Sequence, residues 1–291
     1  MKIGIVGFGP FAQFLSNTII KQGHTVSATS RSDYSHLCSQ LGVQFFKYNH
    51  NYNYILYLYS FIPSPPKLLS SCSSYTCRDS CAFLDADNDV VLICTSILSL
   101  SQVLASLPLG RLKRPLLFVD VLSVKEHPKQ VLLQVLPEES DILCTHPMFG
   151  PDSGKDGWRD LNFMYEKVRV RDEATCSNFL HIFASEGCRM LEMSCEEHDR
   201  LAAKSQFITH TIGRSLAEMD IKPTPIDTKS FQTLIQLKET TTGSSFDLFS
   251  GLFTHNRFAK QELENLENAL HKVKEMLIQR MNEEQVLQKI E

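Results

Sequence analysis

The sequence predicts an α/β protein in which a doubly wound parallel sheet is followed by an all-helical C-terminal domain. Over the first two thirds of the chain, short runs that are apolar on both faces alternate with helical stretches, as in parallel strands covered by helices. A glycine-rich turn follows the first run, and from Cys195 onward the periodicity is helical throughout. We therefore predict an α/β domain over residues 1–194 and a helical domain over residues 195–291.

The composition of the 291 residues is that of a globular protein and excludes several classes of function. Hydrophobic residues make up 43% and charged residues 21%, and the net charge of −4 gives no basic surface for nucleic acid. No apolar run is long enough to span a membrane, and a strand that starts at residue 2 leaves no signal or transit peptide, so we expect a cytoplasmic protein. The nine cysteines are odd in number and scattered, which indicates reduced thiols and no metal site.

The first strand and the turn after it have the pattern of a dinucleotide-binding fold. Lys2–Val6 is a short apolar run, and the six residues after it read G-x-G-x-x-A before a helix over residues 11–22. The first glycine permits a tight turn, the second lets a pyrophosphate approach the backbone, and Ala12 allows close packing of helix and strand. We therefore predict a Rossmann domain whose cofactor-binding residues include Gly7, Phe8, Gly9, Pro10 and Phe11.

The end of the second predicted strand, residues 24–30, indicates which dinucleotide binds. Enzymes that use NAD usually place a carboxylate there to accept from the ribose 2′-OH, whereas this chain has Ser30-Arg31-Ser32. An arginine fork flanked by hydroxyls suits a 2′-phosphate, and no carboxylate stands at the strand end to repel it. We therefore predict NADP, with Asp33 as the residue that would instead serve the ribose of NAD.

Polar residues gather at the C-terminal ends of the later strands, which is the edge where open α/β sheets bind ligands. The later strands are predicted over residues 89–96, 114–123, 141–150, 163–172 and 188–194, and the helices between them over 97–107, 124–137 and 173–184. We assign Thr95, Ser96 and Asp120 to the cofactor. His146 follows a buried strand and precedes Pro147, a position that favours a part in the chemistry over a structural role.

The helical half carries two features of its own. One helix places His198, Ala202, Gln206 and His210 at steps of four, and hence on one face. The last stretch, Phe258–Ile290, is amphipathic. An apolar stripe on a terminal helix with few partners is often a dimer interface, so we expect a homodimer through these helices.

Four segments together resemble the prephenate/arogenate dehydrogenase family, in particular its plant-type branch. They are DVLSVK (120–125), HPMFGPDSGKDGW (146–158), HDRLAAKSQFITHTIGR (198–214) and SSFDLFSGLF (244–253). The resemblance covers almost the whole chain except residues 47–77. It implies a Rossmann domain, a helical dimerisation domain, and NAD(P)-dependent oxidative decarboxylation of a cyclohexadienyl acid in tyrosine biosynthesis.

The resemblance also implies roles for individual residues. His146 is similar to the family's acceptor of the substrate's 4-hydroxyl proton, and Ser123 to the serine that hydrogen-bonds the substrate hydroxyl and the nicotinamide. The positions that match the substrate-binding residues of the helical domain are Gln206, His210, Thr228 and Ser244. Arg214 is left open between a ligand for a substrate carboxylate and a surface residue.

The residue type at position 244, a serine, indicates which substrate is preferred. Relatives that prefer arogenate typically read Asp-Ser-Phe-Asp where this chain reads Ser244-Ser245-Phe246-Asp247, and a desolvated ammonium needs a carboxylate partner. Without that carboxylate, and without a transit peptide, the sequence favours prephenate dehydrogenase. Asp247 could still serve the ammonium, so arogenate dehydrogenase is the alternative, and a non-catalytic NADP-binding regulator is the third.

Residues 47–77 interrupt the predicted nucleotide-binding domain. Joining Phe46 to Arg78 would give a strand, a short loop and a strand of normal length, whereas the intervening stretch is rich in Asn, Tyr and Ser. We interpret residues 47–77 as a retained intron or a wrong exon boundary, with an evolved lid or partner loop as the alternative.

Overall fold

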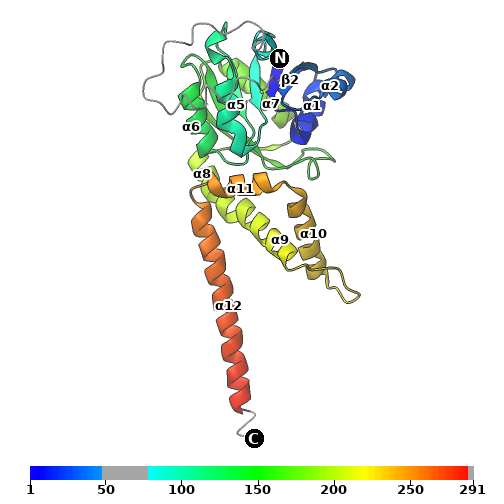
Figure 1. The fold of residues 1–291 in the computed structure, drawn as a ribbon, viewed down its shortest axis with the longest axis vertical. Coiled ribbons are helices and arrows are strands. Elements are labelled where there is room, and N and C mark those ends of the chain that lie inside the picture. Colours follow the sequence, from blue (N-terminus) through cyan, green and yellow to red (C-terminus); the bar gives the residue numbers. More distant parts are fainter. Residues whose placement is uncertain (48–77, 288–291) are drawn as a thin grey trace. The chain divides into compact units, whose positions relative to one another are not determined.

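The computed structural model describes residues 1–47 and 78–287, which belong to two compact units, Met1–His198 and Asp199–Glu291 (Figure 1). Each unit is described by itself below. Apart from Lys47, the stretch interpreted as a retained intron lies outside the described residues.

The first unit is built on an eight-stranded sheet with the strand order β3-β2-β1-β4-β5-β6-β7-β8. The strands are β1 (Lys2–Val6), β2 (Thr25–Ser30), β3 (Gln44–Lys47), β4 (Val90–Ile93), β5 (Leu117–Asp120), β6 (Asp141–Pro147), β7 (Asn162–Arg169) and β8 (Arg189–Glu192). The first six are parallel, which confirms the predicted doubly wound sheet, but β7 pairs with β6 antiparallel. The reversal has a simple cause: residues 148–161 hold turns and no helix, and parallel neighbours need a helical crossover.

The strand order reverses between β1 and β4, so a crevice forms above their carboxyl ends. From β1 the chain winds outward through β2 and β3, and from β4 it winds the other way through β5 and β6. The helices of this unit are α1 (Pro10–Lys21), α2 (Ser35–Leu41), α4 (Arg78–Leu84), α5 (Leu100–Ser106), α6 (Glu126–Val135) and α7 (Glu173–Ser185).

Burial on both faces explains why the central strands read as unbroken apolar runs. Every residue of β4, β5 and β6 is buried. On one face, α1 contributes Leu15 and Ile19 to the same core as Phe179 and Phe183 of α7. Gln22 ties these two helices together, because its Nε2 donates to the Ile182 carbonyl at 2.9 Å and to Glu186 Oε1 at 2.8 Å.

The second unit is helical. The chain enters it through α8 (Cys195–Ala202), and its helices are α9 (Ile208–Glu218), α10 (Lys229–Gly243), α11 (Phe246–Thr254) and α12 (Ala259–Leu287). Between α8 and α9, residues Ala203–Phe207 form a π-helical turn. A π-helical turn is wider than an α-helical turn, and the periodicity of the sequence does not predict it.

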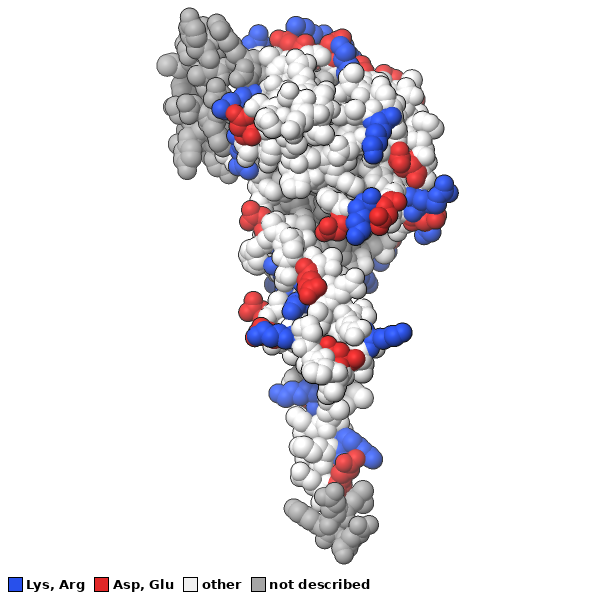
Figure 2. Space-filling model, turned by 90° about the vertical axis from the view of Figure 1, so that its right-hand side faces the viewer, with Lys and Arg blue, Asp and Glu red and all other residues white. Residues whose placement is uncertain are grey.

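Charged and apolar side chains both lie on the surface of the part of the chain that the structure describes. No helix among residues 1–47 and 78–287 is long and apolar enough to cross a membrane. On the face drawn in Figure 2, basic and acidic side chains are interspersed. Several apolar side chains of α12 are exposed, and they are Leu270, Val273, Met276, Leu277, Ile278 and Met281.

Candidate active site

The turn between β1 and α1 has the geometry that the glycine motif predicts. Gly7 has a φ of +89°, and a Cβ there would lie 2.6 Å from the Cys94 carbonyl oxygen, so the position requires glycine. Gly9 is the N-cap of α1, and a Cβ on it would meet nothing within 4 Å. The space beside Gly9 therefore lets a ligand reach the backbone. Pro10 begins α1, where its missing N–H costs no hydrogen bond.

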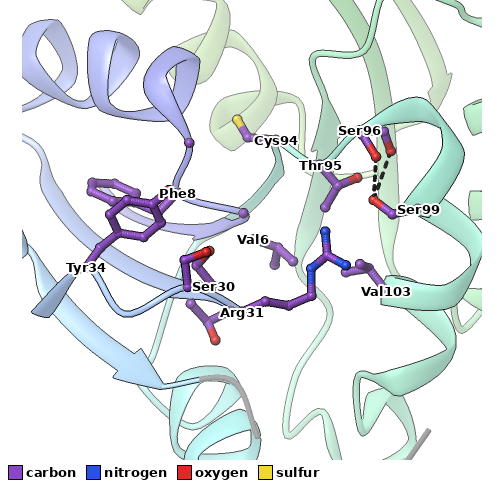
Figure 3. Close-up of a pocket in the computed structure, with 14 residues that line it drawn as sticks. Val6, Phe8, Ser30, Arg31, Tyr34, Cys94, Thr95, Ser96, Ser99 and Val103 are labelled. Carbon is purple, nitrogen blue, oxygen red and sulfur yellow. Dashed lines mark hydrogen bonds between the residues drawn. The ribbon is translucent and has the colours of Figure 1, made fainter. Parts of the chain in front are cut away.

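A hollow with about 640 Å³ of empty space lies over the carboxyl ends of β1, β2 and β4 (Figure 3). Eight of the predicted cofactor residues line it, namely Gly7, Phe8, Gly9, Ser30, Arg31, Ser32, Thr95 and Ser96. Pro10, Phe11 and Asp120 do not line it. Opposite the glycine turn, the Ser96 and Ser99 hydroxyls are hydrogen-bonded to each other at 2.8 Å.

Arg31 is the charged side chain among the residues that line the hollow. Figure 3 shows it extending from the end of β2 across the hollow toward Thr95 and Val103. Asp33 lies outside the lining, and its carboxylate accepts a hydrogen bond from the Ser35 N–H at 2.9 Å. The hydrogen bonds from Ser35 hold the pKa of the Asp33 carboxyl below its ordinary value. Asp33 is thus engaged in the turn before α2.

Two hydroxyls at this hollow lack partners. The Oγ1 atoms of Thr29 and Thr95 are buried and make no hydrogen bond with the described residues. Buried polar groups are nearly always hydrogen-bonded, so unpaired ones in a concave site indicate a missing polar ligand. Together with the open space at Gly9 and the cation of Arg31, they fit a dinucleotide cofactor.

Asp120 ends β5 and is paired inside the unit. Lys125, in the loop before α6, donates from Nζ to Asp120 Oδ1 and to the Thr145 carbonyl, and both charged side chains are fully buried. Burial raises the pKa of the Asp120 carboxyl, and the Lys125 ammonium opposes that rise. The pair connects the loop after β5 to β6. A further hydrogen bond, from Thr145 Oγ1 to the Asp120 carbonyl at 2.6 Å, joins the same two strands.

His146 lies in β6, one residue before the end of the strand, and within the strand predicted over residues 141–150. Its ring is 3% exposed, and its Nδ1 is hydrogen-bonded to Nε2 of His198, on α8, at 2.8 Å. No described residue bonds its Nε2. Burial lowers the pKa of His146 well below its ordinary value, with smaller contributions from the charges of His198 and Lys125. The imidazole is therefore neutral at physiological pH and can accept a proton.

Ser123 lies in the loop three residues after β5, and its side chain is half-buried. Asp120 of β5 is paired with Cys144 of β6. Ser123 lies three residues beyond Asp120 and His146 two residues beyond Cys144, so both lie at the same edge of the sheet. The Ser123 hydroxyl makes no hydrogen bond with a residue that the structure describes, so it can bond a ligand.

In the second unit, three polar side chains follow one another along the π-helical turn and α9. Gln206 Oε1, His210 Nδ1 and Arg214 Nε are all buried and lack a partner among the described residues. Their spacing of four residues places them along one side of the helix, where His210 and Arg214 lie against Phe249 of α11. Burial lowers the pKa of His210, and the Arg214 charge adds to this. Such a row suits a polar ligand.

Ser244 adjoins this row, whereas Thr228 does not. Ser244 follows α10, and its carbonyl accepts from Arg214 Nη2 at 2.7 Å. Asp247, in the first turn of α11, is exposed. Thr228 caps the other end of α10, about 24 Å away along the helix, and its Oγ1 accepts from the Phe231 N–H at 3.3 Å. Capping therefore accounts for Thr228.

Comparison with known proteins identifies the family. The chain is 46% identical over 288 residues to arogenate dehydrogenase 2, chloroplastic, of Arabidopsis thaliana, and the alignment covers 98% of this chain and 72% of that protein. The chain belongs to the plant-type prephenate/arogenate dehydrogenase family. Arogenate dehydrogenase 1, chloroplastic, of the same plant is 49% identical over 286 residues, or 97% of this chain, although this chain spans only 40% of that relative's length.

Domain models and solved structures agree with this membership in the family. The model of the prephenate dehydrogenase nucleotide-binding domain matches residues 70–171, and that of a TYRAAT1-like C-terminal domain matches residues 215–289. The fold is similar to that of prephenate dehydrogenase from A. aeolicus, with a TM-score of 0.67 and 14% identity over 98% of this chain and 93% of that one. Synechocystis arogenate dehydrogenase gives a TM-score of 0.59, with 15% identity over 97% and 93%.

Three of the residues described above are not assigned a role by sequence reasoning. Lys125 carries a signal that could have been noticed, since it is a lone lysine among apolar residues between a buried strand and a helix. His198 falls on a periodic helix face, but nothing local shows that it meets a histidine 52 positions earlier in the chain. Arg214 is left open because its ring contacts come from a different helix.

Proposed function

We propose that this family member catalyses the NADP-dependent oxidative decarboxylation of prephenate to 4-hydroxyphenylpyruvate in tyrosine biosynthesis. The observation that carries the proposal is a buried, neutral His146 with an available Nε2 at the edge of a nucleotide-binding sheet, in a chain of the prephenate/arogenate dehydrogenase family. Arogenate dehydrogenase, which would make tyrosine directly, is the alternative that the names of the two plant relatives favour.

The residues of the first unit would handle the 4-hydroxyl of the substrate. His146 Nε2 accepts the hydroxyl proton as the ring loses hydride, and Ser123 holds the same oxygen by a hydrogen bond. A bound nicotinamide would supply the hydride acceptor for C4, and release of the ring carboxylate as carbon dioxide would complete the aromatisation. The low pKa of His146 keeps its ring neutral, and hence able to accept, throughout the physiological pH range.

The residues of the second unit would hold the substrate. Gln206 and His210 present unpaired buried polar atoms, which hydrogen bonds to the hydroxyl and carboxylate groups of the substrate would satisfy. Ser244 lies beside Arg214 at the end of this row and carries no charge. The absence of a carboxylate at position 244 favours the keto acid prephenate over the ammonium-bearing arogenate.

Arg31 supports NADP over NAD as the cofactor. A charge-assisted hydrogen bond from a guanidinium to a 2′-phosphate contributes about 1.5–3 kcal/mol, which corresponds to a preference of about 10- to 100-fold. The Asp33 carboxylate is held by Ser35 and is not part of the lining of the hollow, so it does not compete for the ribose.

The exposed apolar side chains of α12 support pairing of this helix with a second copy of the chain, so we propose a homodimer. A cytosolic location stays a prediction, which imaging of a fluorescent fusion would test. A non-catalytic NADP-binding regulator would keep the hollow but would turn over neither substrate.

Replacing His146 tests the proposed chemistry. His146→Asn keeps a polar side chain but loses the proton acceptor, so turnover of prephenate should fall by about two orders of magnitude or more. Initial rates of NADPH formation would measure the effect, with His181→Asn on the exposed face of α7 as the matched control. Turnover near the wild-type rate in His146→Asn would refute the role of this histidine.

A further inference from the structure

We propose that His198 is a positioning residue for His146: its Nε2 accepts the proton on His146 Nδ1 and so fixes the tautomer in which His146 Nε2 is the acceptor. The inference rests on the proposed function, because it concerns the same proton. It assigns a task to a side chain that does not line the hollow.

The geometry of the pair is that of a preformed hydrogen bond between two buried rings. Nδ1 of His146 and Nε2 of His198 are 2.8 Å apart, the ring centroids are 5.0 Å apart, and the ring planes are inclined at 66°. Each residue is only 3% exposed, so water does not compete for the bond. His146 comes from a strand whose residues are all buried, which leaves its ring little freedom to turn.

The helix that carries His198 is also fixed to the sheet. The N–H of Cys195, at the start of α8, donates to Glu166 Oε2 on β7 at 2.6 Å. The other oxygen of Glu166 accepts from Lys129 of α6 at 2.5 Å. β7, itself bonded to α6, thus holds the start of α8, and His198 follows three residues later. The position of His198 relative to β6 is therefore determined by the fold of the first unit.

A single proton lies between the two bonded nitrogens, and its position decides what His146 can do. If His198 Nε2 carried it, His146 Nδ1 would be the acceptor, and a neutral His146 would then have its proton on Nε2 and could not accept another there. If His146 Nδ1 carries the proton, Nε2 has a free lone pair. When the substrate O–H bond breaks and the Nε2–H bond forms, His146 becomes an imidazolium whose Nδ1–H is still bonded to His198.

The positive charges near His146 disfavour the protonated, cationic form of its ring. The ionisable groups that face it are His198 from α8 and Lys125 from the loop before α6, with Asp120 of β5 paired to that lysine. Burial is the largest cause of the low pKa of His146, and the charges of His198 and Lys125 lower it further. Replacing His198 by a residue that keeps a hydrogen-bond acceptor but has no ionisable group should therefore raise the pKa of His146 and move the acidic limb of the activity profile to higher pH.

Two substitutions at position 198 separate the effect of the hydrogen-bond acceptor from the effect of side-chain volume. His198→Leu removes the acceptor, and we expect kcat with prephenate to fall by about 10- to 100-fold, the usual effect of losing an outer partner of a functional histidine. His198→Gln can place an amide oxygen near the position of Nε2 and should retain most of kcat. In His198→Gln the acidic limb should move to higher pH, and in both variants KM and the Kd for NADP should change little. His181→Leu, on the exposed face of α7, is the matched control.

The tautomer itself can be measured without turnover. Nitrogen NMR of wild-type protein with ¹⁵N-labelled histidine, assigned with the His146→Asn variant, should show the proton of His146 on Nδ1. A proton on Nε2 would overturn the proposal, as would a His198→Leu variant with wild-type kcat. If His198→Leu does not fold, the NMR result and the pH profile of His198→Gln decide. Loss of the proposed function is a separate outcome, since wild-type protein would then show no turnover.

Discussion

Ser244 is the residue at which the choice between the two substrates is expected to be made. Its backbone is held, because its carbonyl accepts from Arg214 Nη2 at 2.7 Å and Ser245 caps the next helix, α11. The Arg214 guanidinium in turn lies over the rings of Phe249, at 5.1 Å, and Phe246, at 5.7 Å. A new side chain at position 244 would therefore sit on a fixed backbone, and a change in selectivity could be attributed to its charge.

Introducing a carboxylate at this position should favour arogenate. In Ser244→Asp, the new charge would pair with the ammonium of arogenate and repel the anionic keto acid, so the ratio of kcat/KM for arogenate to that for prephenate should rise by ~10-fold or more. The measurement is steady-state kinetics with both substrates. Thr242→Asp adds the same charge two residues earlier, on an exposed part of α10, and should leave the ratio unchanged. An unmoved ratio in Ser244→Asp would assign selectivity to another residue, such as Asp247.

At the residue scale, the sequence could predict the places of those residues that a local motif or a strand end specifies. The glycine turn, Arg31 and His146 can be assigned because a motif or a strand end specifies their place. Asp120 is different: a carboxylate at a strand end reads as a cofactor ligand, and only the fold brings the Lys125 ammonium to it. The orphaned atoms of Gln206, His210 and Arg214 likewise become visible only when their burial is known.

At the scale of elements, the predicted strands agree closely with the structure because each is a short apolar run between polar turns. Two departures could not be predicted. The antiparallel direction of β7 depends on how residues 148–161 fold, and a strand's apolar pattern does not encode its direction. The π-helical turn Ala203–Phe207 changes the helical register without leaving a signature in the periodicity.

The packing of α9 on α10 should depend on a glycine. A Cβ on Gly213 would lie 2.1 Å from Oγ1 of Thr241, a buried residue of α10. Gly213→Ala should therefore lower the free energy of unfolding by about 1–3 kcal/mol, although alanine by itself favours a helix. Denaturant unfolding would measure this, and Gly213→Ala combined with Thr241→Ala should recover most of the loss. A more stable Gly213→Ala protein would contradict the close packing.

At the scale of the whole molecule, each of the two units carries candidate residues of its own. The proposed proton acceptor and the hollow belong to Met1–His198, and the row of unpaired polar atoms belongs to Asp199–Glu291. The sequence could predict that an α/β part precedes a helical part, because hydrophobic periodicity changes along the chain. It could not predict that His146 and His198 touch, since a contact between positions 52 residues apart depends on the tertiary fold.

The most direct test of the account follows both products of the proposed reaction. Purified protein would be given prephenate or arogenate with NADP or NAD, and the NADPH or NADH formed and the carbon dioxide released would be quantified together. We predict equal amounts of NADPH and carbon dioxide from prephenate, at a higher kcat/KM than with arogenate or with NAD. Faster turnover of arogenate would contradict the assignment of substrate, and the absence of reduced cofactor with every combination would contradict the account as a whole.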